Sequence, residues 1–583
     1  MSTQQKLMSN WRWWLCSLLF VATTVNYLDR QVLSLTWEDF IKPEFGWTDD
    51  DYGTITGLFS IFYAVACLFA GKFVDWMGTK KGYLIAIGVW SFGAVLHAGC
   101  GLATMFIEGY SSMGEMATAV KAGGNAALAI STTSVYLFLL CRGILALGEA
   151  GNFPAAIKVT AEYFPKKDRA LATSIFNAGA SVGALAAPLC IPAIANATSW
   201  EMAFIIIGAL GFIWMFFWQF MYDKPDKSKH VNEAELAYIN QDDTTEAEKA
   251  KAKDEKQMSL WQCLKFKQTW AFIAGKFFTD GVWWFFLFWA PSYFKNQFGY
   301  GTKTEMGMWL LFVLYLIVTI LSIFGGYLPK RFVEKKGMEP YAGRMLAMLM
   351  FAFLPLMALL AQPLGQYSVW WPAILIGIVG AGHQAWSANL FSTVGDMFPK
   401  SAIATVTGIG AMAGGIGSLI IQKSAGKLFT SAQGTFAFRE KTYELSADAI
   451  NKIPLLQNPV PQDIAPDVLM SKVDSIGGQV LEPLADGTAN FVFNGDTCAL
   501  TADGINQISL LSEQIPQSAT AQELMLKAQE IGGTISSDPL TFMGFEGKPA
   551  GYFIVFCVCG VAYIIAWSIM KALVPKHKPV DVK

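Results

Sequence analysis

Twelve stretches of the sequence are apolar for long enough to cross a lipid bilayer, and they restrict the possible folds more than any other feature. A bilayer needs about 20 apolar residues per helix, so twelve spans would use about 240 residues. We therefore predict an all-α membrane protein with twelve transmembrane helices. The stretches lie at residues 11–35, 52–73, 82–107, 131–153, 169–193, 202–221, 268–293, 307–328, 344–361, 369–394, 403–428 and 549–572.

The composition excludes several other classes of protein. Hydrophobic residues make up 53% of the chain and charged residues only 15%, against roughly 45–50% and about 25% in a soluble domain, which argues against a soluble enzyme. The net charge of -2 offers no electrostatic footprint for nucleic acid. Nine cysteines without a CxxC pair indicate neither a disulfide framework nor a metal site.

The distribution of Lys and Arg predicts the orientation. The loops after even-numbered helices contain 22 of these residues and the loops after odd-numbered helices contain 4. Cytoplasmic loops are the ones enriched in Lys and Arg, so we expect both termini to be cytoplasmic. The first apolar stretch continues into Asn26 without a small-residue cleavage site, so we expect it to remain in the mature chain.

A duplication is visible in the loops after helices two and eight. Gly71–Lys81 and Gly326–Gly337 both begin with glycine and end in a basic cluster. Equivalent loops in two sets of six helices indicate two pseudo-symmetric six-helix bundles, the usual architecture of alternating-access carriers. We expect contacts at the first loop to change between two conformations, which makes its residues candidates for conformational gating: Gly71, Asp75, Gly78, Lys80 and Lys81.

The apolar and polar stretches divide the chain into five parts. We predict an N-terminal bundle at 1–221, a cytoplasmic linker at 222–267, helices seven to eleven at 268–430, an exterior insertion at 431–547, and helix twelve with a cytoplasmic tail at 548–583. In the linker, Asn232–Glu235 is typical of a helix start with a capping box. A solvated connector is the simpler interpretation of the linker, and a partner site is the alternative.

The exterior insertion contains two repeats of about 55 residues. At an offset of 55, 19 of the 46 positions from 435 to 480 are identical. Each unit opens with alternating apolar residues, as at 436–443, which predicts a strand, and a helix with Ser446 or Thr501 as N-cap is expected to follow. We predict two small α+β modules in one exterior domain, either a structural cap or a docking site for a partner.

Six ionisable residues lie within predicted spans. Each costs about 2.5–3.5 kcal/mol on insertion scales, so an intramembrane charge indicates a functional site. We expect these residues to face a cavity or one another. They are Asp29 and Arg30 in helix one, Arg142 and Glu149 in helix four, and Lys276 and Asp280 in helix seven.

The spacing of these charges predicts their roles. Arg142 and Glu149 are seven residues apart and so lie on one face, about two turns or roughly 10 Å apart. A guanidinium group stays charged and binds a carboxylate with a planar fork, whereas burial favours the protonated form of a carboxyl group. Arg142 is therefore a candidate anion anchor, and Glu149 and Asp29 are candidate proton sites. The alternative is a permanent ion pair between Glu149 and an arginine.

Other polar side chains at membrane depth complete a possible site for a hydroxylated ligand. Tyr27 shares a face with Arg30 on helix one. Lys276 is either a ligand residue or simply neutralised by Asp280, four residues along the helix. Each of the remaining groups is a ligand contact or an interhelix hydrogen bond: Tyr63, Asn177, Ser181, His383, Gln384, Ser387 and Asn389. Trp283, Trp284 and Trp289 either stack on a sugar or belong to the packing.

The sequence resembles the major facilitator superfamily in its paired loops, and the anion:cation symporter family in three motifs. These are Asn26-Tyr-Leu-Asp-Arg30, Arg142-Gly-Ile-Leu-Ala-Leu-Gly-Glu149-Ala-Gly-Asn-Phe-Pro154 and Phe164-Pro-Lys-Lys-Asp-Arg169-Ala. Within that family, the stretches Lys276–Trp289 and His383–Pro399 are similar to bacterial hexuronate transporters. The resemblance implies a substrate site at Arg30 and Arg142, proton handling by Asp29 and Glu149, and location in the bacterial inner membrane.

These observations predict a secondary active transporter, and no enzyme. The resemblance alone supplies the substrate, a hexuronate such as glucuronate or galacturonate imported by proton symport. We expect no metal and no cofactor other than the coupling protons, and no partner beyond the sugar acid, protons and lipid, apart from any partner of the exterior domain. The alternatives are another organic anion, such as galactonate or a glucarate-type diacid, and a nontransporting nutrient receptor.

Overall fold

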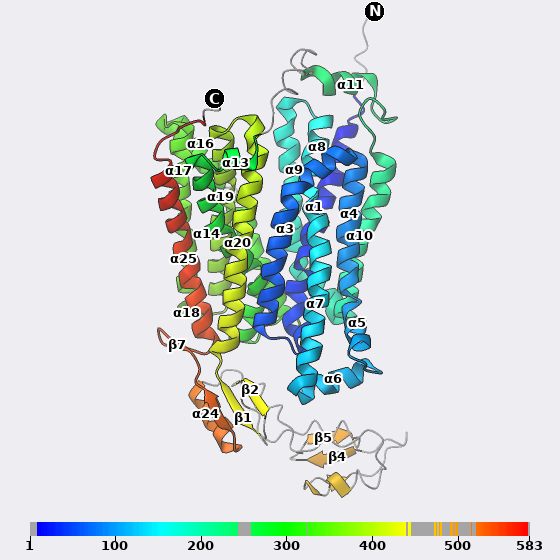
Figure 1. Ribbon diagram of the computed structural model, residues 1–583, viewed down its shortest axis with the longest axis vertical. Helices are drawn as coiled ribbons and strands as arrows, with labels where there is room; N and C mark the ends of the chain where they lie inside the picture. Colours follow the sequence, from blue (N-terminus) through cyan, green and yellow to red (C-terminus); the bar gives the residue numbers. More distant parts are fainter. Residues whose placement is uncertain are drawn as a thin grey trace, which may run out of the picture. The chain divides into compact units, whose positions relative to one another are not determined.

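Long helices make up most of the chain (Figure 1). The computed structural model describes residues 8–242, 258–322, 324–438, 441–444, 471–473, 475–476, 479–480, 490–493, 496–499, 515 and 521–580. Within these ranges nine helices are long and apolar enough to cross a membrane, and ten if Thr79–His97 and Cys100–Ile107, which meet at 55°, count as one span. The chain is therefore a multi-pass membrane protein.

The helices before the linker are called the first set. Their bounds are α1 Trp11–Thr36, a π-helical turn Trp37–Ile41, α2 Lys42–Phe45, α3 Asp49–Met77, α4 Thr79–His97, α5 Cys100–Ile107, α6 Met113–Ala122, α7 Gly124–Glu149, α8 Asn152–Tyr163, α9 Lys166–Ala197 and α10 Trp200–Met221. In the linker, α11 spans Glu233–Ile239, a 3-10 turn spans Asn240–Asp242 and α13 spans Leu260–Cys263.

The helices after the linker are called the second set. Their bounds are α14 Lys267–Phe298, α15 Glu305–Ser322, α16 Phe324–Lys336, α17 Pro340–Ala352, a 3-10 turn Leu354–Met357, α18 Ala358–Gly365, α19 Trp370–Met397, α20 Lys400–Ala432 and α25 Lys548–Leu573. Each of the twelve predicted apolar stretches falls on one of these helices or on a consecutive pair. Two long helices, α1 and α19, are not among the nine apolar ones; both contain the polar residues singled out above.

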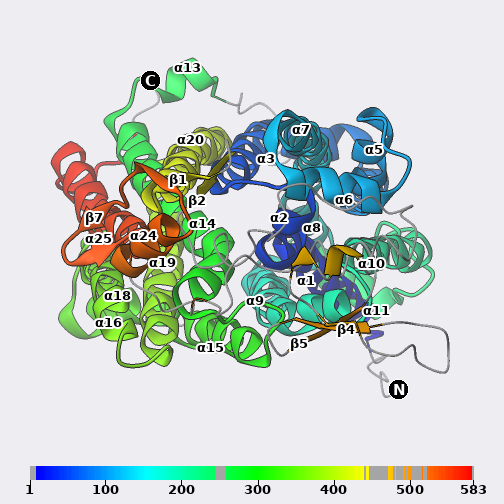
Figure 2. The same cartoon turned by 90° about the horizontal axis from the view of Figure 1, so that it is seen from below.

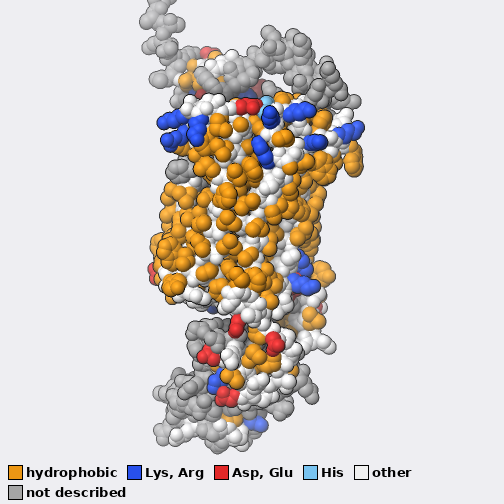
Figure 3. All heavy atoms as spheres, turned by 90° about the vertical axis from the view of Figure 1, so that its left-hand side faces the viewer, with side chains coloured by type: hydrophobic (Ala, Val, Ile, Leu, Met, Phe, Trp, Pro, Cys, Tyr) orange, Lys and Arg blue, Asp and Glu red, His pale blue; other side chains and the backbone are white. Residues whose placement is uncertain are grey.

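The two sets occupy separate sides of the helical region when it is seen from below (Figure 2). α1 begins, and α25 ends, at the same end of this region (Figure 1). On the face formed by the second set, hydrophobic side chains form a broad band with Lys and Arg side chains along its upper edge (Figure 3). Such a band suits contact with lipid, with the basic residues at the level of the head groups.

Glycine permits the closest helix approaches within the first set. A Cβ atom on Gly148 of α7 would lie 2.3 Å from the backbone nitrogen of Trp90 in α4, and one on Gly179 of α9 would lie 2.3 Å from the carbonyl oxygen of Phe20 in α1. Small residues at such crossings let two backbones pack closely where lipid provides no hydrophobic driving force. The first crossing fixes the position of Glu149, the residue next to Gly148.

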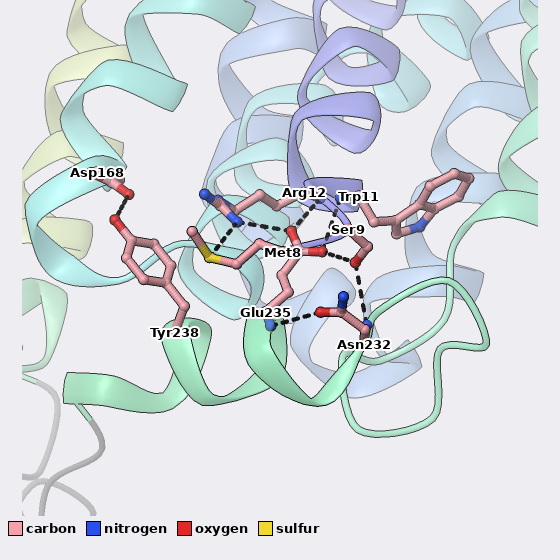
Figure 4. A network of polar contacts seen from close by, with 8 residues as sticks. All are labelled: Met8, Ser9, Trp11, Arg12, Asp168, Asn232, Glu235 and Tyr238. Carbon is pink, nitrogen blue, oxygen red and sulfur yellow. Dashed lines mark hydrogen bonds and ion pairs between the residues drawn. The ribbon is translucent and has the colours of Figure 1, made fainter. Parts of the chain in front are cut away.

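The linker helix α11 is fixed to the start of α1 (Figure 4). Asn232 accepts from the backbone N–H of Glu235 at 2.9 Å, which confirms the predicted helix start. The Glu235 carboxylate, however, accepts from Arg12 Nη1 at 2.9 Å and from the backbone N–H groups of Trp11 and Arg12 at 3.0 and 3.2 Å. Glu235 and Arg12 are both buried. One face of α11 is therefore buried through Glu235 and Ile239, while Glu233 on the same helix is exposed.

Residues 429–551 form a compact unit of their own. Its elements are β1 Thr435–Phe438, β2 Lys441–Glu444, β3 Gln479–Val480, β4 Asn490–Phe493, β5 Asp496–Ala499, α24 Ala521–Glu530, β6 Thr534–Ser537, β7 Thr541–Phe542 and β8 Phe545–Glu546. The strands form sheets in the orders β2-β1-β6, β3-β4-β5 and β7-β8. The single strand predicted at 436–443 is wrong: β1 and β2 pair as an antiparallel hairpin, which alternation alone does not distinguish from one strand. The predicted N-caps Ser446 and Thr501 lie outside the described residues.

The two repeats of this unit exchange their third strands. At the offset of 55 residues, β1, β2 and β3 of the first repeat correspond to β4, β5 and the start of β6 in the second. Ala437 of β1 lies opposite Thr534 of β6, and the equivalent Val492 of β4 lies opposite Gln479 of β3. Each hairpin is thus completed by the third strand of the other repeat, in the same register.

Candidate transport site

An ion pair between α1 and α7 forms the centre of the candidate site. Arg30 donates through Nε and Nη2 to Oε2 of Glu149, at 3.0 and 2.7 Å. Arg30 is 5% exposed and Glu149 is fully buried. The structure thus contains an ion pair between Glu149 and an arginine, the alternative that the sequence left open. Removing either partner would leave an uncompensated buried charge.

Aromatic rings from both sets surround the guanidinium group of Arg30. Its Cζ atom lies 5.2 Å from the ring centroid of Tyr27, 4.7 Å from that of Tyr63 and 5.2 Å from that of Trp284. Such contacts stabilise a cation by about 0.5–2 kcal/mol each. Trp284 belongs to α14, so the second set contacts the charged pair of the first set through this residue.

Arg142 and Asp29 lie beside this pair with unused hydrogen-bonding groups. Arg142, on α7, is 2% exposed, and its Nη1 has no hydrogen-bond partner among the described residues. Its Cζ atom lies 5.1 Å from the ring centroid of Phe59. Both carboxylate oxygens of Asp29, on α1, are likewise without a partner in the described part of the chain. Buried polar groups are normally satisfied, so these atoms are suited to water or a ligand.

The charged residues of α14 pair with each other. Lys276 Nζ lies 2.6 Å from Asp280 Oδ2, and it lies 4.7 Å from the ring centroid of Phe391. This is the neutralising arrangement that four-residue spacing on a helix allows. In this conformation the ammonium group of Lys276 therefore has a carboxylate partner within its own helix.

The polar residues of α19 lie in different surroundings. His383 Nδ1 lies 2.7 Å from the Tyr563 hydroxyl, and its ring stacks on that of Trp283 at 5.5 Å. Asn389 donates to the carbonyl oxygens of Gly325 and Ala385 at 2.8 Å and lines a separate cavity, so the structure does not bring it to the Arg30 pair. Gln384 and Ser387 of α19 are half-buried, and Asn177 of α9 is exposed.

The predicted gating residues make their contacts within the first set and the linker. Lys158 Nζ lies 2.8 Å from Asp75 Oδ1, and Lys80 Nζ lies 2.9 Å from Asp223 Oδ1. Gly78 ends α3 with a φ of 79°, a conformation that favours glycine. The other two members of the group are Gly71, whose Cβ position is open, and Lys81, which is exposed.

The two sets are joined by polar contacts near the end of α1 and the start of α3, which the sequence did not reveal. Tyr52 donates to the carbonyl oxygen of Phe288 at 2.9 Å, and the hydroxyl groups of Ser60 and Ser418 lie 2.8 Å apart. The Asp39 carboxylate accepts from Thr302 Oγ1 at 3.0 Å. The only hint of these contacts in the sequence was the presence of charged residues in the loops 37–51 and 294–306. A single sequence does not indicate which residues of two such distant loops contact each other.

The comparison with known families decides the classification. The profile described as Major Facilitator Superfamily matches residues 19–421. The chain belongs to the major facilitator superfamily. Members of this superfamily that resemble the chain are transporters rather than enzymes.

Among superfamily members, the chain is similar to several sugar-acid transporters. It is 29% identical over 420 residues to the hexuronate transporter of Escherichia coli (strain K12), covering 72% of this chain and 87% of the relative. It is also 29% identical over 321 residues to the galacturonate transporter of Dickeya chrysanthemi, covering 55% and 82%. The sequence-based resemblance to hexuronate transporters is thereby confirmed.

Solved structures of other superfamily members have the same fold. The chain resembles a bacterial homologue of the human lysosomal transporter Spinster, with a TM-score of 0.58, 16% identity and coverage of 98% and 99% of the two chains. It also resembles a D-xylose-proton symporter, with a TM-score of 0.52, 14% identity and coverage of 72% and 90%. At these identities the likeness establishes the fold alone.

Proposed function

We propose that this chain imports a hexuronate anion, such as glucuronate or galacturonate, by proton symport. The principal support is the buried guanidinium group of Arg142, which has an unpartnered Nη1 and lies two turns from Glu149 on α7. A fixed cation next to an arginine–carboxylate pair suits a ligand that brings its own carboxylate. The names of the hexuronate and galacturonate transporters among the relatives support the sugar acid.

In the proposed mechanism, the substrate and Glu149 compete for Arg30. Protonation of Glu149 removes its negative charge, so Arg30 becomes available to the carboxylate of the substrate, which Arg142 also binds. Release of the proton and the substrate allows the ion pair between Arg30 and Glu149 to form again. If a second proton is coupled, Asp29 is its proposed site. Tyr27 and Tyr63 position Arg30, and Lys276, Asn177, Gln384 and Ser387 remain proposed substrate residues for other steps of the cycle.

The proposed architecture has twelve transmembrane helices in two pseudo-symmetric bundles of six, with alternating access between them. We place both termini in the cytoplasm, residues 431–547 on the periplasmic side, and the protein in the bacterial inner membrane. The excess of Lys and Arg in alternate loops supports this orientation. The loop residues Gly71, Asp75, Gly78, Lys80 and Lys81 would change their contacts as the bundles move. No cofactor beyond protons is proposed.

Uptake into proteoliposomes tests this mechanism. We expect Arg142→Ala to abolish substrate binding, because it removes the buried cation that has no carboxylate partner of its own among the described residues. Glu149→Gln should retain exchange of labelled substrate across the membrane but lose accumulation driven by a pH gradient. Arg331→Ala and Glu201→Gln remove the same charges away from the site and should behave like the parent chain. Full proton-driven accumulation by Glu149→Gln would contradict the role of Glu149.

The number of protons can be measured in the same vesicles. A monoanion that enters with one proton moves no net charge, whereas a second proton couples import to the membrane potential at about 2.3 kcal/mol per charge per 100 mV. We expect one proton, exchanged at Glu149, and therefore no response of initial uptake to an imposed voltage. Faster uptake at a negative internal potential would instead indicate a second coupled proton, with Asp29 as its site.

A different sugar acid is the second candidate substrate. The relatives include a D-galactonate transporter of Escherichia coli, 25% identical over 438 residues, and a probable galactarate/D-glucarate transporter of the same species, 24% identical over 419 residues. Competition among glucuronate, galacturonate, galactonate and glucarate for binding to the purified protein at two pH values distinguishes these substrates. Tighter binding of galactonate or glucarate than of both hexuronates would overturn the proposed substrate.

A further inference from the structure

A cavity in the second set has no role in the proposed transport mechanism. It has a volume of about 370 Å³ and lies among α16, the start of α17 and the later part of α19. Lys330, Glu334 and Arg344 contribute charged side chains to its lining, and Asn389 and Ser392 contribute polar ones. The remaining lining residues are small or apolar: Gly325, Pro329, Val333, Pro340 and Ala388.

The duplication of the chain explains why this space is empty of protein. Counting from Gly71 and Gly326, which begin the paired loop motifs, Lys330 occupies the position of Asp75. Counting back from the Phe-Pro pairs at 164–165 and 398–399, Ser392 occupies the position of Lys158. The cavity therefore lies where the first set has a lysine side chain bonded to an aspartate.

The two sets of helices also differ in the charges at these equivalent positions. In the first set Lys158 Nζ lies 2.8 Å from Asp75 Oδ1 and donates to the carbonyl oxygen of Val74 at 3.2 Å. In the second set the lysine is replaced by a serine, whose hydroxyl donates to Ala388 within α19, and the aspartate is replaced by Lys330. An ammonium group would meet the Lys330 and Arg344 cations here, so the space suits a ligand with negative charge better than a cation.

Two cations of the cavity are able to bind such a ligand. The Lys330 side chain is 69% exposed, and its ion pair with Glu334, at 3.7 Å, is also exposed; such pairs contribute little to stability and are exchanged easily. Arg344 bonds to Asp396 and to the carbonyl oxygen of Ser392, in both cases through Nη1. A guanidinium group has five N–H donors, so Arg344 can keep Asp396 while it binds an additional anion.

The position of the cavity favours a lipid as the source of this anion. α16 ends and α17 begins at the end of the helical region where α25 finishes (Figure 1), and Lys and Arg side chains line the edge of the apolar band on this face (Figure 3). Basic pockets between transmembrane helices at the cytoplasmic side are suited to phosphate head groups. Apolar walls next to the two cations would accommodate the first carbon atoms of the acyl chains.

We propose that this cavity binds the phosphate group of an anionic phospholipid, at a site separate from the transport site. Lys330 and Arg344 bind the phosphate oxygens, and Ser392 and Asn389 lie beside the glycerol part. Lysine and arginine both form charge-assisted hydrogen bonds with phosphate. The first set lacks an equivalent site, because Lys158 fills the corresponding space and neutralises Asp75.

Thermal stabilisation and native mass spectrometry of the purified full chain test the proposal. The lipid probe is phosphatidylglycerol in detergent micelles, compared with phosphatidylcholine. We expect phosphatidylglycerol to stabilise the parent chain, and Lys330→Gln to weaken its binding about fivefold, the effect of one lysine near a charged head group. Lys335→Gln removes the same charge from the last turn of α16 without touching the cavity and is the matched control. An equal loss in the control would overturn the proposal, because it would indicate general surface attraction.

A double variant keeps the test independent of lost stability. Lys330→Asp with Ser392→Lys introduces into the second set the aspartate and lysine of the first, so the cavity should fill and the fold should remain stable. We expect this variant to retain substrate binding and to lose its response to phosphatidylglycerol. Undiminished lipid binding by the double variant would refute the site. Stabilisation by inorganic phosphate or glycerol 3-phosphate, with no effect of phosphatidylglycerol, would refute the lipid as its source.

Discussion

Replacing Asp39 by Asn should favour conformations in which the two sets of helices separate near the end of α1. Asp39 lies in the π-helical turn after α1 and is 7% exposed. Its carboxylate accepts from Thr302 Oγ1 at 3.0 Å and from the backbone N–H of Lys303 at 3.4 Å, and it lies 3.4 Å from Lys295 Nζ. All three partners belong to the end of α14 or the loop that follows it, so this one side chain joins the two sets.

The expected effect follows from these contacts. A hydrogen bond to a charged group contributes about 1.5–3 kcal/mol. The two contacts at 3.4 Å are long, and the Lys295 side chain is 40% exposed, so the ion pair adds little. Asn retains an oxygen for Thr302 but loses the charge. A neutral hydrogen bond of about 0.5–1.5 kcal/mol therefore remains, and we expect a net loss of about 1–1.5 kcal/mol. This is roughly a fivefold to tenfold change in the population of the separated state.

A buried cysteine reports this population. Ser418→Cys, in a chain whose native cysteines are replaced, places a thiol at the contact with Ser60 between the two sets. A membrane-impermeant maleimide added on the side of this contact should label the thiol faster in the Asp39→Asn chain, by the factor given above. Asp51→Asn is the control, because Asp51 bonds to Thr48 and Ser131 within the first set. Equal labelling rates with and without Asp39→Asn, in a folded protein, would refute the reasoning.

Three further predictions concern stability and packing. Burial raises the pKa of Glu44, in the short helix α2 between α1 and α3, to about 7, although Trp200 donates to its carboxylate at 2.6 Å. The folded state therefore binds a proton that the unfolded state releases near pH 4.5, so stability should fall from pH 5 to 8, and thermal melts of Glu44→Gln should show a smaller fall. Arg12→Ala should destabilise the protein by about 3–5 kcal/mol, since it leaves Glu235 buried without its cation; a double-mutant cycle with Glu235→Gln should recover part of this loss. Gly148→Ala should slow transport more than it lowers expression, because the new methyl group forces α7 away from α4 beside the transport site; an unchanged uptake rate would contradict this.

Residue spacing in the sequence was sufficient to predict the features that lie within one helix. The seven-residue spacing of Arg142 and Glu149 predicted a shared face of α7, and the four-residue spacing of Lys276 and Asp280 allowed the pair that the structure contains. Sequence could not decide which arginine would pair with Glu149. That choice depends on the crossing of α1 with α7, and Arg30 is 119 residues from Glu149 in the chain.

The largest surprises involve partners that are remote in sequence. Glu235 was expected to cap its own helix, but a buried arginine at the start of α1 attracts its carboxylate more strongly than a backbone N–H does. Asp39 was not singled out, because a single acidic residue in a loop is usually solvated. Asn389 was grouped with the transport site from its depth in α19, yet its amide bonds to α16. Residue type and depth predict that a polar group needs a partner, but not which neighbour supplies it.

The exchanged strands of the unit formed by residues 429–551 indicate that the lengths of its connections contribute to its topology. Residues 481–489 separate β3 from β4 in the sequence, whereas the longer segment 445–478 separates β3 from its own hairpin. By loop-closure entropy, pairing β3 with β4 costs about 1 kcal/mol less than pairing β3 with its own hairpin. The pairing of β6 with β1 closes a longer connection and offsets part of this difference. Two related repeats can thus adopt different strand partners because of the lengths of their connections, and shortening the segment 445–478 should favour pairing of β3 with its own hairpin.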